Sequence, residues 1–426
     1  MNRRFDVVVV GAGSAGSSAA ISAARLGART MLIDRLPFLG GTSTAVLDTF
    51  YAFYTPGPSQ IRVVGGIGWE VAQALESQGM AFERPNTYGA GTGVTYDPET
   101  LKVLWEQLNE DAGVEVLLHT WATGVEQHDG QATAIRVWNK GGESVIEAAV
   151  IVDTSGDADL CAMAGVPYED AKSTPNLQSL STIFRVANVD VEKAAALPKT
   201  ELWAMMRAAA ASGEYRLPRL EGSWHRTPHP GVVTVHMTRI PNVDATDPAQ
   251  LTRAEIEGRR QVREYHRFLR DRVPGFARSV LVATSPAIGV RESRRVIGDY
   301  RLTRDDVLSA RRFADEIALC GAPIEDHAAG PDTRWTYVPQ SGVYGIPYRC
   351  LLPEVIEGLL VAGRCFSATH DAHASARSMA TCMAMGQAAG TAAALAAAGA
   401  STPRQLDAKR LRECLLERGA VLTVEN

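Results

Sequence analysis

The chain has 426 residues, 46% of them hydrophobic, so it can bury a large core divided into two or three domains. Its formal net charge of −5 gives no general attraction for nucleic acid or anionic lipid, and we expect neither as a partner. The six cysteines are scattered without a CxxC pair, which favours free thiols and a cytoplasmic location. Asp6 interrupts the early apolar run, which argues against a signal peptide, and no run reaches the ~20 residues of a membrane span.

The N-terminal segment predicts a dinucleotide-binding unit. Residues 5–10 (FDVVVV) read as a buried strand, 11–16 (GAGSAG) as a glycine turn and 17–26 as a helix. A second strand pattern at 28–33 ends in an acidic residue, Asp34. This context makes the GxGxxG motif a specific signal, although a tight structural turn is the alternative.

The residue types of this unit suit specific roles. Gly11 allows the tight turn, Gly13 lets the backbone approach a pyrophosphate, and Gly16 lets the helix pack on the strand. Asp34 is placed to accept a hydrogen bond from a ribose hydroxyl. The residues of this unit that we expect to bind the cofactor are Gly11, Gly13, Ser14, Ala15, Gly16, Asp34 and Arg35.

A second small-residue loop, 39–44 (LGGTST), has no purpose in a simple NAD domain, although it could be an ordinary connection. DVVVVGAGSAGSSAA together with LGGTST resembles the opening of the FAD-dependent oxidoreductases related to the fumarate reductase and glutathione reductase flavoproteins. The resemblance implies FAD as cofactor, with Gly41, Thr42 and Ser43 beside it.

The next segment predicts a helix followed by a β-meander. Asp97-Pro98 should begin the helix, and its buried stripe comprises Leu101, Leu104, Trp105 and Leu108. Asp129-Gly130 and Gly141-Gly142 predict hairpin turns before a strand at 145–153. The fold class is therefore α/β: a Rossmann-like FAD-binding domain, whose parallel sheet carries a β-meander, with an inserted α+β substrate domain.

Small and acidic residues follow the strand that returns from the meander, at the sheet edge where open α/β folds bind ligands. In the resembled family, this position closes over the phosphates and adenosine of FAD, which implicates Ser155, Gly156 and Asp157. A solvated acidic loop is the alternative. Ala122, at the start of the meander, is also predicted to bind the cofactor.

We assign residues 1–170 and 341–426 to the FAD-binding domain and 171–340 to the substrate domain. The middle region predicts a strand at 232–240 and a charged helix at 251–270. The helix has a possible Thr252/Glu255 capping box and an apolar stripe of Ile256, Val262, Tyr265 and Leu269. The region is rich in Trp, His and Tyr, including His225 and His236, which we interpret mostly as core or surface residues.

Residues 288–300 (IGVRESRRVIGDY) resemble the GxRExRR-x-x-GD segment of a bacterial group of FAD-dependent oxidoreductases. These arginines could form structural ion pairs, or Arg291 could hold an anionic group of the substrate. No second GxGxxG follows a strand, so we expect an external electron acceptor such as oxygen, a quinone or a carrier protein.

The C-terminal part resembles the closing FAD motif of the same superfamily. Residues 358–364 read as a strand that ends at Gly363, whose backbone would meet the pyrophosphate beside Arg364. The helix that begins near Met379 would aim its free N–H groups at the flavin, which places Cys382 and Met383 against the cofactor. Cys382 is expected to be a buried thiol.

His370 and Arg377 are the polar groups of this C-terminal segment that could face the flavin or the substrate. Histidine can act as a base near neutral pH, and arginine can hold a carboxylate or stabilise a flavin anion. His370 and His373 have no third ligand at a telling spacing, so we predict no metal site. The catalytic candidates are His370, Arg377 and Arg291.

These patterns predict an FAD-dependent oxidoreductase, a dehydrogenase or oxidase that transfers a hydride from a small organic substrate to flavin N5. One alternative is a fumarate-reductase-like enzyme that reduces a C=C bond. Another is a protein in which FAD is structural or the reaction is redox-neutral. A homo-oligomer is left open.

Overall fold

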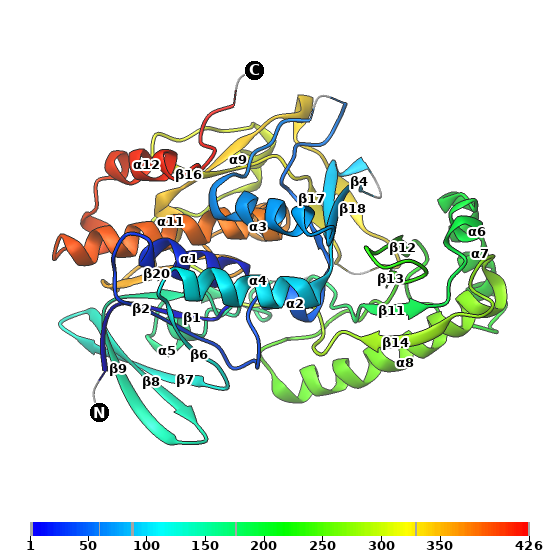
Figure 1. Ribbon diagram of the computed structural model, residues 1–426, viewed down its shortest axis with the longest axis horizontal. Coiled ribbons are helices and arrows are strands. Elements are labelled where there is room, and N and C mark those ends of the chain that lie inside the picture. Colours follow the sequence, from blue (N-terminus) through cyan, green and yellow to red (C-terminus); the bar gives the residue numbers. More distant parts are fainter. Residues whose placement is uncertain (1–2, 59, 87–88, 175–176, 329, 425–426) are drawn as a thin grey trace.

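The structure, a computed structural model, describes residues 3–58, 60–86, 89–174, 177–328 and 330–424. A parallel sheet lies at its centre, in the order β6 (Glu115–Leu117), β2 (Thr30–Ile33), β1 (Arg3–Val10), β9 (Gly142–Asp153) and β20 (Leu359–Val361). All four inner pairings are parallel. The first strand and the last strand of the chain thus both flank β9, as the predicted Rossmann-like fold requires (Figure 1).

The predicted β-meander extends this sheet on one side. β7 (Trp121–His128) and β8 (Gln131–Asn139) are antiparallel, and β8 pairs with the first half of β9. Residues 129–130 form the turn between β7 and β8, and Asn139 pairs with Gly142 at the second turn. The α/β fold class and its meander are confirmed.

Helices cover one face of the sheet: α1 (Ser14–Ala24), α3 (Gly66–Ser77), α4 (Pro98–Asp111), α11 (Met379–Ala398) and α12 (Ala408–Glu417). On the opposite face, α5 (Asp159–Met163) packs on β7 and β9. The predicted start of α4 is confirmed, because Asp97 accepts a hydrogen bond from the Thr100 N–H. Its predicted apolar stripe is buried in full.

Helices α1 and α11 pack against each other through bare backbone. A Cβ atom added at Gly386 would overlap the carbonyl of Ala15, and one added at Gly390 would overlap the carbonyl of Ala19. Fifteen of the twenty residues of α11 are Ala, Gly, Thr or Cys, so the helix can lie this close along most of its length. The C-terminal helix is thereby held against the helix that follows the glycine turn.

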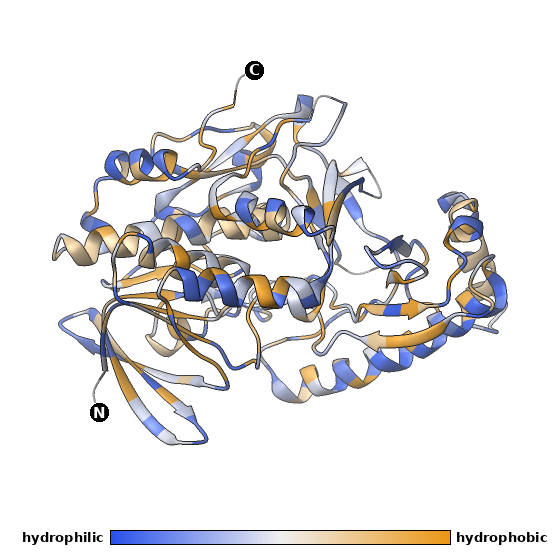
Figure 2. Ribbon diagram, viewed as in Figure 1, coloured by the Kyte–Doolittle hydropathy of each residue, from blue (hydrophilic) through white to orange (hydrophobic). Residues whose placement is uncertain are grey.

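The middle of the chain forms an antiparallel sheet in the order β12 (Ser223–Arg226), β13 (Val233–His236), β11 (Phe184–Ala187) and β14 (Val280–Thr284). Helices α6 (Val191–Ala195), α7 (Lys199–Ala211) and α8 (Pro248–Arg272) accompany it at the right of Figure 1. This region has a hydrophobic core of its own, between Phe184 and Phe276. Figure 2 shows α8 as largely hydrophilic beside the apolar strands β11 and β14.

Three local predictions in this region are wrong. β13 covers only Val233–His236, because the chain leaves the sheet after four residues. Helix α8 begins earlier than predicted, capped by the Asp247 carboxylate and not by Thr252/Glu255. Ile256 is 43% exposed, because the helical repeat places it on the side of α8 opposite to the apolar stripe that Val262, Tyr265 and Leu269 do form.

Short elements connect the two regions: α2 (Thr42–Ala45), β3 (Thr49–Phe50), β4 (Ala81–Pro85), β5 (Thr92–Tyr96), β10 (Tyr168–Glu169), β15 (Arg295–Val296), α9 (Arg304–Leu308), β16 (Glu316–Cys320), β17 (Ile324–Asp326), β18 (Arg334–Thr336), β19 (Tyr344–Pro347) and α10 (His370–Ala376). Residues of the 302–324 segment pack into the core around the parallel sheet. The domain boundary at 340 stays a prediction.

All six cysteines are free thiols, and no helix of the described residues could span a membrane.

The close backbone contact between α1 and α11 predicts that the stability of the protein is sensitive to an added methyl group at Gly390. Gly390→Ala should lower the free energy of unfolding by about 1–3 kcal/mol, because its methyl group has no space beside Ala19. Gly399→Ala, at the exposed end of the same helix, is the matched control and should change stability much less. Denaturant unfolding monitored by circular dichroism measures both, and equal effects would contradict this packing.

Candidate active site

The glycine turn has the shape that a close approach of pyrophosphate requires. Gly11 has φ +99° and lies against the backbone of Thr154, while Gly16 packs on the carbonyl of Gly11. A Cβ atom added at Gly13, by contrast, would meet no described atom within 4 Å. The first N–H groups of α1, at Ser14 and Ala15, have no partner within the helix and are available to an anion.

The second glycine loop lies directly against the first. The N–H of Gly40 donates to the carbonyl of Ala12 at 2.7 Å, and Gly40 also pairs with Gly13 in a parallel bridge. A Cβ atom on Gly41 would lie 2.8 Å from the Gly13 Cα. Thr42 is exposed, whereas Ser43 is buried and donates to the Gly40 carbonyl. The two predicted cofactor loops therefore form one continuous backbone surface.

Asp34 lies at the end of β2, beside the glycine turn. Its carboxylate accepts hydrogen bonds from the N–H of Ala12 at 2.6 Å and of Leu36 at 2.7 Å. Burial raises its pKa, although these two hydrogen bonds act in the opposite direction. Each carboxylate oxygen keeps a second lone pair, so a ribose hydroxyl could still bind. Arg35 next to it is exposed, and Ala122 is half-buried at the start of β7.

The predicted closing motif reaches the same place. A Cβ atom on Gly363 would lie 2.8 Å from Cβ of Ala15, so the end of β20 meets the start of α1. Ser155 donates to Asp153 at 2.6 Å in the loop after β9, and Gly156 lies against the Arg364 guanidinium. The residues predicted from both ends of the chain converge around one turn.

Arg364 is tied to the loop after β9. Its guanidinium donates to Asp157 at 2.8 Å and to the hydroxyl of Ser293 at 2.8 Å. Burial would raise the pKa of Asp157, but Arg364 and the Ser293 hydroxyl outweigh it and hold that pKa below its usual range. Because Ser293 hydrogen-bonds to both members of this ion pair, it joins the 288–300 segment to the predicted nucleotide site.

Helix α11 begins beside these loops. The N–H of Ala380 donates to the Tyr51 carbonyl at 3.3 Å, and Met383 is fully buried. Cys382 is a buried thiol, as predicted, and burial raises its pKa to about 12. A thiol of that pKa is a poor nucleophile at neutral pH.

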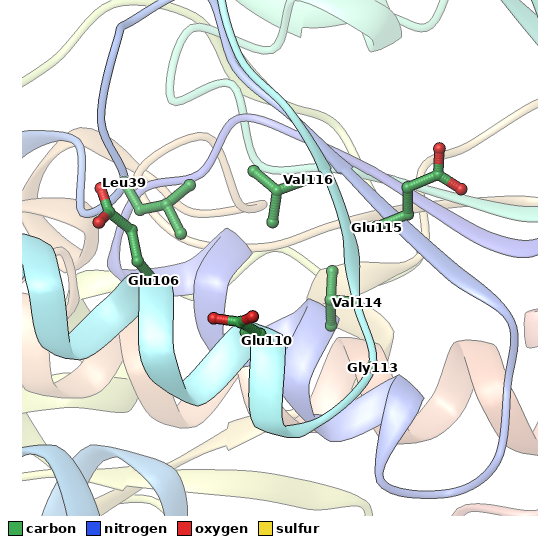
Figure 3. A pocket seen from close by; sticks show the side chains of 7 residues that line it. All are labelled: Leu39, Glu106, Glu110, Gly113, Val114, Glu115 and Val116. Atoms are coloured by element: carbon green, nitrogen blue, oxygen red, sulfur yellow. The ribbon is translucent and has the colours of Figure 1, made fainter.

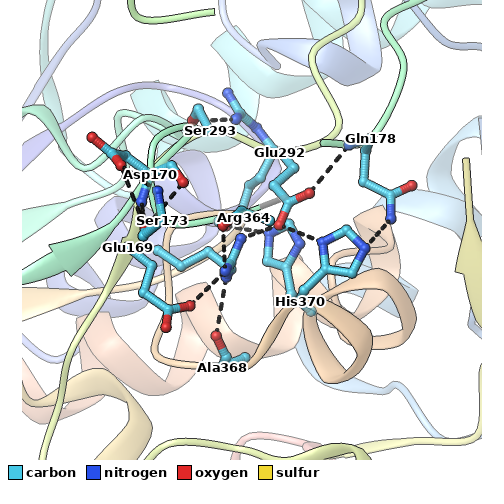
Figure 4. Close-up of polar contacts among 12 residues, drawn as sticks. Glu169, Asp170, Ser173, Gln178, Glu292, Ser293, Arg364, Ala368 and His370 are labelled. Atoms are coloured by element: carbon cyan, nitrogen blue, oxygen red, sulfur yellow. Dashed lines mark hydrogen bonds and ion pairs between the residues drawn. The ribbon is translucent and has the colours of Figure 1, made fainter. Parts of the chain in front are cut away.

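His370, at the start of α10, is held by a network around the buried Glu292 (Figure 4). Its Nδ1 donates to Glu292 at 2.9 Å, and its Nε2 lies 3.2 Å from the Gln178 amide nitrogen and 3.9 Å from Asp326. Arg295 also pairs with Glu292.

These contacts determine the charge of His370. Burial lowers its pKa, but the nearby carboxylate of Asp326 and the hydrogen-bonded carboxylate of Glu292 outweigh burial and raise the pKa to about 9. The Gln178 amide nitrogen opposes the protonated ring, yet a neutral dipole counts for less than two carboxylates. His370 is therefore mainly a cation at neutral pH. Its expected role as a base stays a prediction, which these surroundings restrict to alkaline pH.

Four arginines from loop positions in different parts of the chain interact electrostatically, a group that we call the arginine cluster: Arg219, Arg239, Arg291 and Arg377. Arg291 donates to the Ser179 carbonyl at 2.6 Å and to Ser181, but has no carboxylate partner among the described residues. Burial, together with the charge of Arg377, lowers the pKa of Arg291 to about 9. Burial likewise lowers the pKa of Arg239 to about 10, with Arg219 adding to it.

The arginine cluster is incompletely paired within the described part of the chain. The buried Nε atoms of Arg219, Arg239 and Arg377 have no hydrogen-bond partner there. The Glu325 carboxylate lies 2.8 Å from Nε2 of His327. Burial would raise the pKa of Glu325, but His327, Arg377 and Arg291 hold it far below its usual range. Two of these four arginines, Arg219 and Arg239, were missed in the sequence, because single arginines without a motif carry no signal.

Arg294 and Arg295 differ from Arg291, although they belong to the same segment. Arg294 pairs with Asp159 at 3.0 Å, and Arg295 pairs with Glu169 at 2.6 Å as well as with Glu292. The interpretation of this segment as structural ion pairs thus fits Arg294 and Arg295. Arg291 is the arginine of the segment that is able to bind an anion.

Two surface hollows of about 460 Å³ each lie apart from the arginine cluster. The first is lined by Leu39, Glu106, Glu110, Gly113, Val114, Glu115 and Val116 (Figure 3). Its three glutamates make it unsuitable for phosphate or carboxylate groups. The second is lined by Ala171, Lys172, Thr174, Leu177, Asn242, Asp244, Asp247 and Gln250.

Comparisons with known proteins show the family of the chain. The family described as FAD dependent oxidoreductase matches residues 6–415, and the chain belongs to that family. It is an enzyme, and its cofactor is FAD. The open space at Gly13 and the unpaired N–H groups of α1 fit the pyrophosphate of that cofactor.

Two curated relatives are tRNA uridine 5-carboxymethylaminomethyl modification enzymes MnmG. The one from Desulfotalea psychrophila is 33% identical over 93 residues, which is 20% of this chain and 12% of that protein. The one from Geobacter metallireducens is 25% identical over 167 residues, 36% of this chain and 24% of that protein. The matches span less than a quarter of either relative.

Two solved structures share the fold. A geranylgeranyl bacteriochlorophyll reductase-like protein from Thermoplasma acidophilum has a TM-score of 0.50 at 13% identity, covering 99% of this chain and 85% of its own. A triple mutant of the flavin-dependent brominase Bmp2 has a TM-score of 0.51 at 12% identity, covering 97% and 84%. At such identities the likeness concerns the fold alone.

The open space at Gly13 leads to a testable prediction. Gly13→Ala should leave the free energy of unfolding of the FAD-free protein within about 0.5 kcal/mol, because its φ of −69° and the empty surroundings accept a methyl group. FAD affinity should fall by about tenfold or more, because the methyl group occupies the path of the pyrophosphate. Titration of deflavinated protein with FAD measures this. Undiminished affinity would place the pyrophosphate elsewhere.

Proposed function

We propose that this enzyme dehydrogenates a small organic substrate that carries a carboxylate group. The observation that supports the proposal is Arg291, which donates only to neutral oxygen atoms and has no carboxylate partner among the described residues. The charges of Arg377, Arg219 and Arg239 add to its own, and Glu325, Asp326, Asp332 and Glu292 compensate part of the charge of the cluster. A guanidinium group without a carboxylate partner favours an anionic ligand. Bound FAD supplies a hydride acceptor at N5, and the electrons then pass to oxygen, a quinone or a carrier protein.

Arg291 and Arg377 are the residues that we expect to bind the substrate carboxylate. A guanidinium group can bind both carboxylate oxygens at once, which fixes the orientation of the substrate as well as holding it. Both side chains are only partly buried, so a ligand can reach them, whereas Arg219 and Arg239 are buried deeper. The two deeper arginines then contribute mainly to the positive field.

His370 is the residue that we propose as proton acceptor, provided that it is deprotonated. Removal of a hydride from a carbon that bears OH or NH requires a base near that group. With a pKa of about 9, only a small fraction of His370 can accept a proton at pH 7. The Glu292 carboxylate stabilises the protonated ring that results.

Arg377→Gln tests the binding role. The variant should raise the dissociation constant or KM of a carboxylate substrate by ~10- to 100-fold, because it removes a charged hydrogen-bond donor. The methyl ester of the same substrate should be much less affected. Candidate substrates come from anaerobic screening of small hydroxy and amino acids for bleaching of the flavin absorption.

The matched control for Arg377→Gln is Arg304→Gln, a half-exposed arginine that pairs with Asp371 on the neighbouring helix α10. It should leave both constants unchanged. An equal loss with acid and ester would remove Arg377 from carboxylate binding. A flavin that no compound bleaches would favour a structural or redox-neutral role for FAD.

The raised pKa of His370 also favours a second candidate, the reduction of an activated C=C bond, because a protonated group at pH 7 can donate a proton. The sign of the pH dependence separates the two. If His370 is the base of a dehydrogenase, the rate of flavin reduction should rise about tenfold per pH unit between pH 7 and 9 and then level off. If it is the acid of a reductase, oxidation of prereduced flavin by an unsaturated acid should slow above pH 9.

Stopped-flow spectroscopy across this pH range measures both half-reactions. His370→Gln is the corresponding variant, and it should lose the pH-dependent step near 9 while retaining bound FAD. A step that persists in this variant would exclude His370 as the proton-transferring group in either direction.

A further inference from the structure

A second cluster lies where the inserted sheet meets the FAD-binding core. Asp48 follows α2 of that core, His225 belongs to β12 and His236 to β13. The Asp48 carboxylate and one ring nitrogen of each histidine all lie within 4.8 Å of one another. From Asp48 Oδ1, the Nε2 atoms are 3.0 Å away for His225 and 3.7 Å away for His236.

The pairing of β12 with β13 explains why both rings point to one place. His225 lies opposite Thr234, and cross-strand partners share a face of the sheet. His236 is two residues beyond Thr234, so the alternation along a strand directs it to the same face. Thr234 donates to the other oxygen of Asp48, which orients the carboxylate toward the two rings.

Hydrogen bonds within the protein account for only part of this arrangement. His225 is paired with Asp48, but the buried Nε2 of His236 has no hydrogen-bond partner among the described residues, as 3.7 Å is too long. Ligand atoms bound to one ion at roughly 2.0–2.2 Å lie about 3–3.5 Å apart. The two distances from Asp48 Oδ1 to the histidine nitrogens, 3.0 and 3.7 Å, bracket that range.

We propose that Asp48, His225 and His236 bind a divalent transition-metal ion of the Zn²⁺ or Fe²⁺ class. Two imidazoles and one carboxylate suit these ions, whereas Ca²⁺ and Mg²⁺ prefer oxygen ligands. Three protein ligands leave at least one position open, which is typical of reactive and not of purely structural sites.

Two nearby guanidinium groups oppose the ion: Arg219, which donates to the His236 carbonyl at 3.4 Å, and Arg84, which sharpens the test. The Arg84 guanidinium donates to the Thr49 hydroxyl at 3.2 Å, and that hydroxyl lies 3.5 Å from Nε2 of His225. A positive charge this near weakens the binding of a cation. Removing it should therefore tighten metal binding.

Metal binding is tested on tag-free, FAD-loaded protein that has been treated with EDTA and exchanged into metal-free buffer. Titration calorimetry with ZnCl₂, and with ferrous sulfate under anaerobic conditions, should give one saturable site per chain for at least one ion. His236→Asn and Asp48→Asn should each weaken binding by ~100-fold or more, since even outer-shell changes cost 10- to 100-fold. Arg84→Gln should bind more tightly than the unaltered protein.

His229→Asn is the matched control, because His229 lies in the same region but pairs with Asp97 at the surface. It should bind the ion unchanged. The visible spectrum of bound FAD reports folding of each variant, and the partly exposed His236 decides the question if Asp48→Asn does not fold. The proposal is overturned if neither ion binds with 1:1 stoichiometry, if His236→Asn binds undiminished, or if Arg84→Gln fails to tighten binding.

Discussion

The close approach of backbone to backbone around the glycine turn is the constraint on which the rest of the structure depends. Gly11 touches the loop after β9, Gly16 touches Gly11, and Gly386 touches Ala15. Each contact excludes a side chain, and the first N–H groups of α1, at Ser14 and Ala15, have no partner within the helix and are available to a ligand. Because the last contact comes from α11, residues more than 350 positions apart have to be present before the cofactor site is complete.

The charged groups around this site fall into two kinds, which the 288–300 segment illustrates. Glu292, Arg294 and Arg295 satisfy one another or residues of the core, and so join segments of the chain. Arg291, three residues from the first of these arginines, donates only to neutral oxygen atoms and has no direct carboxylate partner among the described residues. Buried charges are usually paired, because desolvation costs several kcal/mol per ion. A buried guanidinium group without a carboxylate partner therefore favours the binding of an anion more strongly than a paired guanidinium group does.

Local sequence patterns were sufficient wherever neighbouring residues determine the structure. The glycine turn, the Asp97 cap of α4 and the Asp129-Gly130 hairpin depend on a few consecutive residues, and the structure confirms each of them. The start of α8 was misplaced, because Asp247 and Thr252 are both good capping residues and only the tertiary structure selects between them. For His370, the sequence showed the histidine itself, but not that Glu292 and Asp326, which set its charge, lie beside it in the fold.

Long-range clusters lie beyond such patterns. His225 is 177 residues from Asp48, and nothing in the spacing connects them until β12 is laid beside the FAD-binding core. The same holds for Arg219 and Arg377, which come from opposite sides of the joint between the two regions. Their position is informative, because a joint that served only to hold two cores together would be more stable if apolar. The polar groups buried at this joint therefore favour a ligand-binding role for it, with an anion proposed at the arginines and a cation proposed at Asp48.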